Sequence, residues 1–219
     1  MTTLTKEQGY SRERTLLIAL LLSIPGPLVA GFAVISSQST TQLADLIRRS
    51  VELIALFLSW WVFRQIQRNL TLNEEGQSQL ERVAGMSVAA AMICSGFIML
   101  AVALSRWSVF EPGGNVLPGL TIAALGFLVN SWFWRRYTVL TNEKYSTVIA
   151  TQQALYRAKT SVDLGVVIAL VAVAVAPAHP VTPYIDISGS IAVAGYLLWS
   201  GMRMARSHWG DFKRLPKRI

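Results

Sequence analysis

The chain contains the stretch Leu43-Ala44-Asp45-Leu46-Ile47-Arg48-Arg49-Ser50-Val51-Glu52, in which four ionisable side chains open an apolar run that continues to residue 63. Charged groups at membrane depth are costly, so they persist where they face a protein interior and find partners. On a helix these four residues are spaced by three, four or seven positions, so they share one face and can pair with one another. The stretch therefore predicts a membrane helix whose charged face is turned toward other helices.

The composition also indicates a membrane protein. Of the 219 residues, 53% are hydrophobic and 15% are charged, and the mean hydropathy is +0.43, which does not suit a soluble domain of this size. Within lipid every backbone N–H and C=O must be paired inside the protein, and long runs without period-2 alternation leave helices as the only candidate. We expect an all-α six-transmembrane-helix bundle, with apolar runs over residues 15–35, 43–63, 84–105, 117–134, 148–176 and 185–204.

The basic residues are distributed unevenly along this pattern. If the N-terminus is cytoplasmic, 15 of the 20 Lys and Arg residues lie on the inner side, and Arg106 alone lies in an outer loop. Cytoplasmic loops carry an excess of Lys and Arg, so we expect a multi-pass protein of the inner (cytoplasmic) membrane with both termini in the cytoplasm. This topology accounts for the formal net charge of +8, which argues for the lipid bilayer and against nucleic acid as a partner.

One domain is expected, with residues 1–14 as a cytoplasmic N-terminal tail, 15–206 as the transmembrane domain and 207–219 as a basic cytoplasmic tail. The first run can also be read as a cleaved signal peptide. Glu13 in its flank and the interruption at Pro25-Gly26-Pro27 favour an uncleaved, kinked helix instead. The polar stretch 65–82 is expected to begin the third helix in its second half.

The third run is rich in small residues, among them Gly85, Ala89 and Gly96, which allow another helix to approach closely. That helix can belong to the same chain or to a second copy. The single cysteine, Cys94, excludes an intramolecular disulfide and a thiolate metal cluster. The sequence offers no nucleophile with a partnered base and no phosphate loop, so we expect neither an enzyme nor a bound cofactor.

A second charged cluster, Arg157, Lys159 and Asp163, lies early in the fifth run. At 1.5 Å per residue, Glu52 lies about 14 Å from the outer end of its span, and Lys159 reaches about the same depth from the opposite side. The two clusters are therefore expected to meet near the midplane, where secondary transporters hold substrate. We expect Glu52 to pair there with Lys159 or Arg48.

Several runs carry motifs that form an ordered pattern. The second run reads Ala44-Asp45-Leu46-Ile47-Arg48-Arg49-Ser50-Val51-Glu52, the third is entered through Gly76-Gln77-Ser78-Gln79-Leu80-Glu81-Arg82, the fourth carries Asn130, and the sixth opens Asp186-Ile187-Ser188-Gly189-Ser190-Ile191. Over residues 15–210 the pattern resembles the transmembrane domain of the cation diffusion facilitators, the cation efflux family of divalent-metal/proton antiporters. The resemblance implies a six-helix bundle of that type and a homodimer, here without the family's soluble C-terminal domain.

The resemblance also implies a metal site of two residues from the second helix and two from the fifth, which fall on Arg48, Glu52, Leu155 and Lys159. Of these only Glu52 can bind a metal ion, whereas zinc needs three or four imidazole, thiolate or carboxylate ligands. We therefore expect no zinc-type site. The Lys159 ammonium can instead act as a surrogate for the metal, or the charges can simply hold the bundle together. A third possibility is an altered, oxygen-rich site for another cation or for protons, formed by Asp45, Glu52, Asp163, Gln42, Gln152 and Gln153, with Asn130 as a further polar residue of the lining.

Two functions of different classes follow from this degenerate site. One is a divergent cation or proton-coupled transporter, in which Glu52, Asp45 and Asp163 carry the cation or proton and Lys159 or Arg48 modulates it. The other is a transport-dead family member retained as a structural or assembly subunit of a larger membrane protein complex, its site closed by ion pairs.

Overall fold

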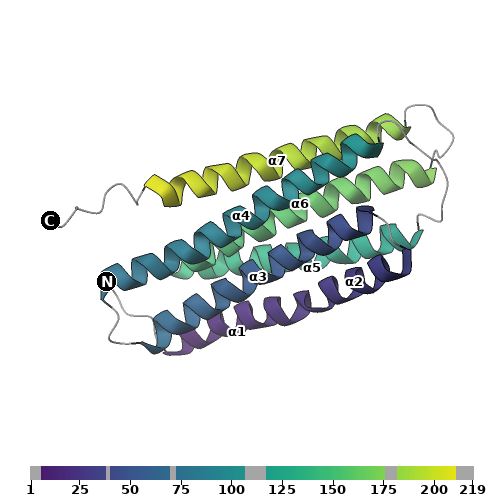
Figure 1. Ribbon diagram of the computed structural model, residues 1–219. Coiled ribbons are helices and arrows are strands. Elements are labelled where there is room, and N and C mark those ends of the chain that lie inside the picture. The colour runs from purple at the N-terminus through teal and green to yellow at the C-terminus, as the bar shows by residue number, and fades with distance from the viewer. Residues whose placement is uncertain (1–5, 38–39, 70–72, 107–116, 176–181, 211–219) are drawn as a thin grey trace.

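The computed structural model describes residues 6–37, 40–69, 73–106, 117–175 and 182–210, and all regular structure in these ranges is α-helical. The helices lie side by side in one elongated bundle, and successive long helices run antiparallel (Figure 1). The predicted all-α class is confirmed. The helices are α1 (Lys6–Ser23), α2 (Pro25–Ser37), α3 (Thr40–Arg68), α4 (Glu74–Arg106), α5 (Leu117–Glu143), α6 (Thr147–Val175) and α7 (Thr182–Gly210).

The first apolar run forms two consecutive helices. Helix α1 ends at Ser23, whose Oγ donates to the carbonyl of Ala19 at 2.8 Å, and α2 begins at Pro25. Proline lacks a backbone N–H and its ring clashes with the carbonyl four residues earlier, so α1 cannot continue through Pro25. At the first position of a new helix the same ring is well tolerated. The kink expected from the sequence is thus a complete break in the helix.

Helix α4 begins where the polar stretch 65–82 enters its second half. Asn73 caps it, because its Oδ1 accepts a hydrogen bond of 2.9 Å from the backbone N–H of Gly76. Glu74 and Glu75 occupy the first turn, where negative charge favours the helix dipole. Among the described residues, the part of α4 from Glu74 to Ser105 is the one helix long and apolar enough to cross a membrane by length and composition.

Helices α4 and α7 pack closely along their length (Figure 1). A Cβ added at Gly96 would lie 2.8 Å from Cγ of Leu198, and one added at Gly201 would lie 2.8 Å from Cγ1 of Ile93. Glycines on both helices therefore allow the backbones to approach more closely than side chains would permit. The small residues of the third apolar run serve a contact within the chain.

An aromatic layer fills the core between α5 and α6. Phe133 and Tyr137 of α5 and Tyr156 of α6 are buried, and the ring centroids of Phe133 and Tyr137 lie 4.9 and 5.3 Å from that of Tyr156. Leu56 of α3 and Leu16 of α1 belong to the same buried cluster. The layer fixes the part of α6 that directly precedes Lys159.

Candidate functional site

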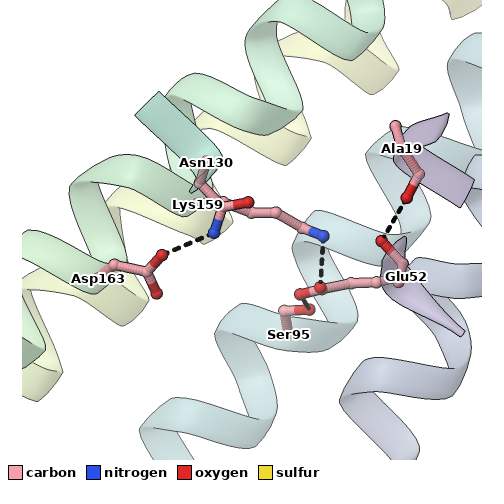
Figure 2. A network of polar contacts seen from close by, with 7 residues as sticks. Ala19, Glu52, Ser95, Asn130, Lys159 and Asp163 are labelled. Carbon is pink, nitrogen blue, oxygen red and sulfur yellow. Dashed lines mark hydrogen bonds and ion pairs between the residues drawn. The ribbon is translucent and has the colours of Figure 1, made fainter. Parts of the chain in front are cut away.

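Glu52 of α3 and Lys159 of α6 form an ion pair, with 2.9 Å between Lys159 Nζ and Glu52 Oε2 (Figure 2). It is one of the two pairings expected for Glu52 from the sequence, the other being with Arg48. Each side chain is only 16% exposed, so the charges are mostly removed from solvent and depend on each other for stabilisation.

Two further side chains complete the surroundings of the pair. Ser95 of α4 donates its hydroxyl proton to the other carboxylate oxygen of Glu52, at 3.2 Å (Figure 2). The Lys159 ammonium also lies 5.3 Å from the ring centroid of Tyr156, within the range of a cation–π interaction. Three helices, α3, α4 and α6, therefore converge on one carboxylate, and both of its oxygens accept a hydrogen bond.

Asp163 lies one helical turn beyond Lys159 and belongs to a second polar contact. The side-chain amide of Asn130, on α5, donates to its Oδ2 at 2.6 Å (Figure 2). Gly126 lies one turn earlier on α5, and a Cβ there would be 3.2 Å from the same oxygen. The α5 backbone thus approaches the carboxylate closely. The two polar residues predicted from the fourth and fifth runs come together.

Arg48 and Arg49, adjacent on α3, are both engaged. Arg48 attracts Glu52 and Asp163 and repels Lys159, which makes it the fourth member of a charge group built around the ion pair. Arg49 faces α2, because its Nη1 lies 3.2 Å from the position that a Cβ on Gly26 would take. The arginines are adjacent in sequence, yet they serve different neighbours.

Other predicted residues lie outside this group. Arg157 is exposed. The Gln152 amide donates to Ser59 Oγ of α3 at 2.7 Å, with both side chains fully buried, and the Gln153 amide donates to Thr138 Oγ1 of α5 at 3.0 Å. These contacts hold α6 to α3 and to α5, two turns along the helices from the ion pair.

Gln42 and Asp45 belong to the first turns of α3, and their side chains lie outside the described residues. Their predicted part in the charge group stays a prediction.

Sequence reasoning missed Ser95 and Ser59 as polar partners. Ser95 counts as a small packing residue in a run of alanines and glycines, and nothing local marks it as a donor. Depth in the membrane is the signal that could have identified Ser95. The apolar runs that contain Ser95 and Lys159 begin on the same side, and each residue lies 11 positions from the start of its run.

The structure places the four residues that fall on the family's metal positions in two different surroundings. Leu155 is 2% exposed and packs in the apolar cluster, while Arg48, Glu52 and Lys159 belong to the charge group. In the part of the chain that the structure describes, no three His, Cys, Asp or Glu side chains gather closely enough to hold a metal ion. Protonated Lys and Arg side chains offer donors and no acceptor lone pair. The four metal positions therefore hold one carboxylate, Glu52, and its partners are already supplied by the protein.

Comparison with known families identifies the chain. Residues 16–210 match the cation efflux transmembrane domain, which covers most of the 219 residues. The protein belongs to the cation efflux family, and the resemblance drawn from its motifs is confirmed. It is accordingly an integral membrane protein of transporter-like type. A search of curated proteins found no match.

Proposed function

We propose that this member of the cation efflux family transports a proton or a monovalent cation through a site built on Glu52, and that it does not carry zinc-type divalent ions. The observation that supports this is the 2.9 Å contact between the Lys159 ammonium and the Glu52 carboxylate. In this proposal the family's metal site is degenerate, and a fixed positive charge has taken the place of the metal.

The charges of the group favour a singly charged cargo. Glu52 and Asp163 supply two negative charges, and Arg48 and Lys159 supply two positive ones, so the group is close to neutral when all four are ionised. A divalent ion would leave two uncompensated charges in a medium of low dielectric constant, where such charges interact strongly. A proton or a monovalent cation adds one positive charge, which the release of one proton from the group can offset.

The proposed membrane arrangement has six spans, with α1 and α2 together forming the first and both termini in the cytoplasm. Two observations support it. The beginning of α1 and the end of α7 lie at the same end of the bundle (Figure 1), as an even number of crossings requires. Most of the basic residues outside the spans also belong to that end.

Cysteine labelling tests this topology. In a Cys94→Ser background, a cysteine placed at Ser39 or Gly113 should react with an impermeant reagent added from outside intact cells. Reaction from the cytoplasmic side alone would overturn the arrangement.

We also infer that the protein forms a homodimer, as the family does. The small residues of α4 are engaged by α7, so the dimer contact would use another surface. Size-exclusion chromatography with light scattering in detergent tests this part of the proposal independently of transport.

Purified protein in liposomes tests the transported ion. With a pH-sensitive dye inside, an imposed Na⁺ or K⁺ gradient should drive proton movement in the wild type and not in Glu52→Gln. Glu75→Gln is the matched control, because Glu75 is an exposed acid of the first turn of α4, away from the pair. Zinc uptake by the wild type that disappears in Glu52→Gln would contradict the proposal.

A second candidate is a transport-dead subunit of a larger membrane complex. The observation that favours it is that both oxygens of Glu52 are already bonded, to Lys159 and to Ser95, which leaves the carboxylate committed to the bundle. Liposomes that show no proton, Na⁺, K⁺ or Zn²⁺ movement, together with stoichiometric copurification of other membrane subunits from native membranes, would favour this candidate over the transporter.

A further inference from the structure

A buried arginine lies at the end of the bundle where α5 leads into α6. The Arg12 side chain, on α1, is 0% exposed. Its Nη2 donates to the backbone carbonyls of Leu140 and Lys144, at 2.6 and 2.7 Å. Carbonyls at the C-terminal end of a helix lack regular intrahelical partners, and a basic side chain is a common substitute. Arg12 therefore holds the end of α5 in place with one of its three nitrogens.

The other two guanidinium nitrogens have no such role. Nε and Nη1 of Arg12 are buried and have no hydrogen-bond partner in the described structure. A guanidinium has five N–H donors, and Nη2 uses two of them, so three remain. Burial lowers the pKa of Arg12, and the field of nearby Glu143 opposes that shift, but arginine stays charged at any physiological pH. Unmet donors on a buried cation are costly, and an anionic acceptor relieves that cost best.

The position of Arg12 along the membrane normal indicates which anion is available. In the six-span arrangement proposed above, Arg12 lies three residues outside the first apolar run, which is about 4.5 Å along the helix axis. The headgroup region extends roughly 5–8 Å beyond the hydrocarbon on each side. Arg136 lies at the same level, two residues beyond the fourth run, and its Nη2 donates to Ser11 Oγ of α1 at 2.8 Å. Arg12 of α1 and Arg136 of α5 thus both lie at the height of the lipid phosphates.

We propose that Arg12 is the centre of a phosphate-binding site on the cytoplasmic side, in which its Nε and Nη1 donate to phosphate oxygens while Nη2 keeps α5 capped. The ligand is a phosphate group, carried by an anionic lipid headgroup or supplied as free phosphate. A phosphate oxygen takes the place of atoms that now cover these nitrogens, so binding fixes α1 against the junction of α5 and α6. The site depends on the proposed topology and not on any transport activity.

The test measures thermal unfolding of the full-length protein in a neutral detergent, with phosphatidylglycerol or inorganic phosphate added in separate titrations. Arg12→Lys is the informative variant. A lysine has three N–H donors, of which the two carbonyls need two, so it preserves the cap and leaves one donor for phosphate. We expect half-saturation at an about tenfold higher phosphatidylglycerol concentration in Arg12→Lys than in the wild type. Arg14→Gln is the matched control, because it removes an exposed positive charge two residues away on the same helix, and it should respond like the wild type.

The two sources of phosphate give different results. Stabilisation by phosphatidylglycerol alone identifies a lipid headgroup, and equal stabilisation by inorganic phosphate identifies free phosphate. Equal responses of Arg12→Lys and the wild type, or no response of the wild type to either compound, would overturn the proposal.

A measurement on the wild type alone covers the case in which Arg12→Lys fails to fold. Hydrogen exchange of the backbone amides of residues 141–147 should slow when phosphatidylglycerol or inorganic phosphate is added. Exchange of the amides of residues 66–69, at the end of α3, should not change. Unchanged exchange at residues 141–147 under both saturating phosphatidylglycerol and saturating inorganic phosphate would also overturn the proposal.

Discussion

The contact between α3 and α6 and the contact between α4 and α7 join helices of similar length by opposite means. The first brings together charges and hydrogen-bonding groups, namely Glu52 with Lys159 and Ser59 with Gln152. The second relies on the absence of side chains at Gly96 and Gly201. A charged contact fails when one partner is neutralised, whereas a glycine contact fails when volume is added. The same bundle should therefore respond to two different kinds of substitution in two different places.

Neutralising one partner of the α3–α6 ion pair should have the largest effect. Glu52→Gln or Lys159→Met leaves one charge buried and unpaired, and each should lower the free energy of unfolding by roughly 3–5 kcal/mol. The double variant should recover most of that loss, because no isolated charge remains. Denaturant or thermal unfolding in detergent supplies the double-mutant cycle. Additive losses would show that the two side chains are not coupled.

Adding one methyl group to the α4–α7 contact should have the next largest effect. A Cβ at Gly201 meets Ile93 Cγ1 at 2.8 Å and the Ala89 carbonyl at 3.1 Å, so Gly201→Ala should cost about 2 kcal/mol by overpacking. Gly195→Ala, on the same helix, is the control, because a Cβ there meets no atom within 4 Å. It should be neutral or stabilise α7 by up to about 1 kcal/mol. Equal effects of the two substitutions would contradict the close approach of α4 and α7.

The hydrogen bond between Gln152 and Ser59, two turns from the ion pair, should contribute less to stability than either of these contacts. Ser59→Ala leaves the Nε2 donor of Gln152 buried without a partner and should cost about 1–2 kcal/mol. Ser59→Ala with Gln152→Leu removes both polar groups and should restore part of the loss. If the second substitution deepens the loss instead, Gln152 has another role in the core.

The smallest effect is expected at the edge of the bundle. Arg64 Nε lies 3.8 Å from Glu13 Oε1, and the two side chains are 35% and 25% exposed. Partly exposed pairs of this kind contribute about 0–1 kcal/mol and are screened by salt. Arg64→Gln should therefore change stability little at low salt and not at all in 0.5 M NaCl. A loss comparable to that of Lys159→Met would place Arg64 among the structural charges.

Depth along a helix was the property that the sequence predicted best. Counting residues from the ends of the apolar runs brings Glu52 and Lys159 to one level, and these two residues form the ion pair. Rotation about each helix axis could not be predicted in the same way. Arg48 and Arg49 share a charged face by spacing, but Arg49 turns toward Gly26 of α2. Which neighbour a side chain meets depends on how the whole bundle packs.

Hydrogen-bond partners that are small side chains or backbone groups could not be predicted from the sequence either. Ser95 donates to Glu52, and the end of α5 accepts from Arg12, yet serine in an alanine-rich helix and a backbone carbonyl carry no distinguishing pattern. The same holds for the partner of the α4 glycines. Their spacing predicts a close helix contact, but α7 is identified only by the tertiary structure.

The break between α1 and α2 has a mechanical consequence. Arg12 fastens α1 to the end of α5, and Leu16 is set in the core, so this half of the segment is rigidly mounted. Helix α2 carries large exposed side chains such as Leu28 and Phe32 and rests on α3. Because Pro25 interrupts the hydrogen-bond ladder between them, bending at this joint is less costly than within a continuous helix. We therefore expect the end of the bundle formed by α2 to change its tilt more easily than the end held by Arg12.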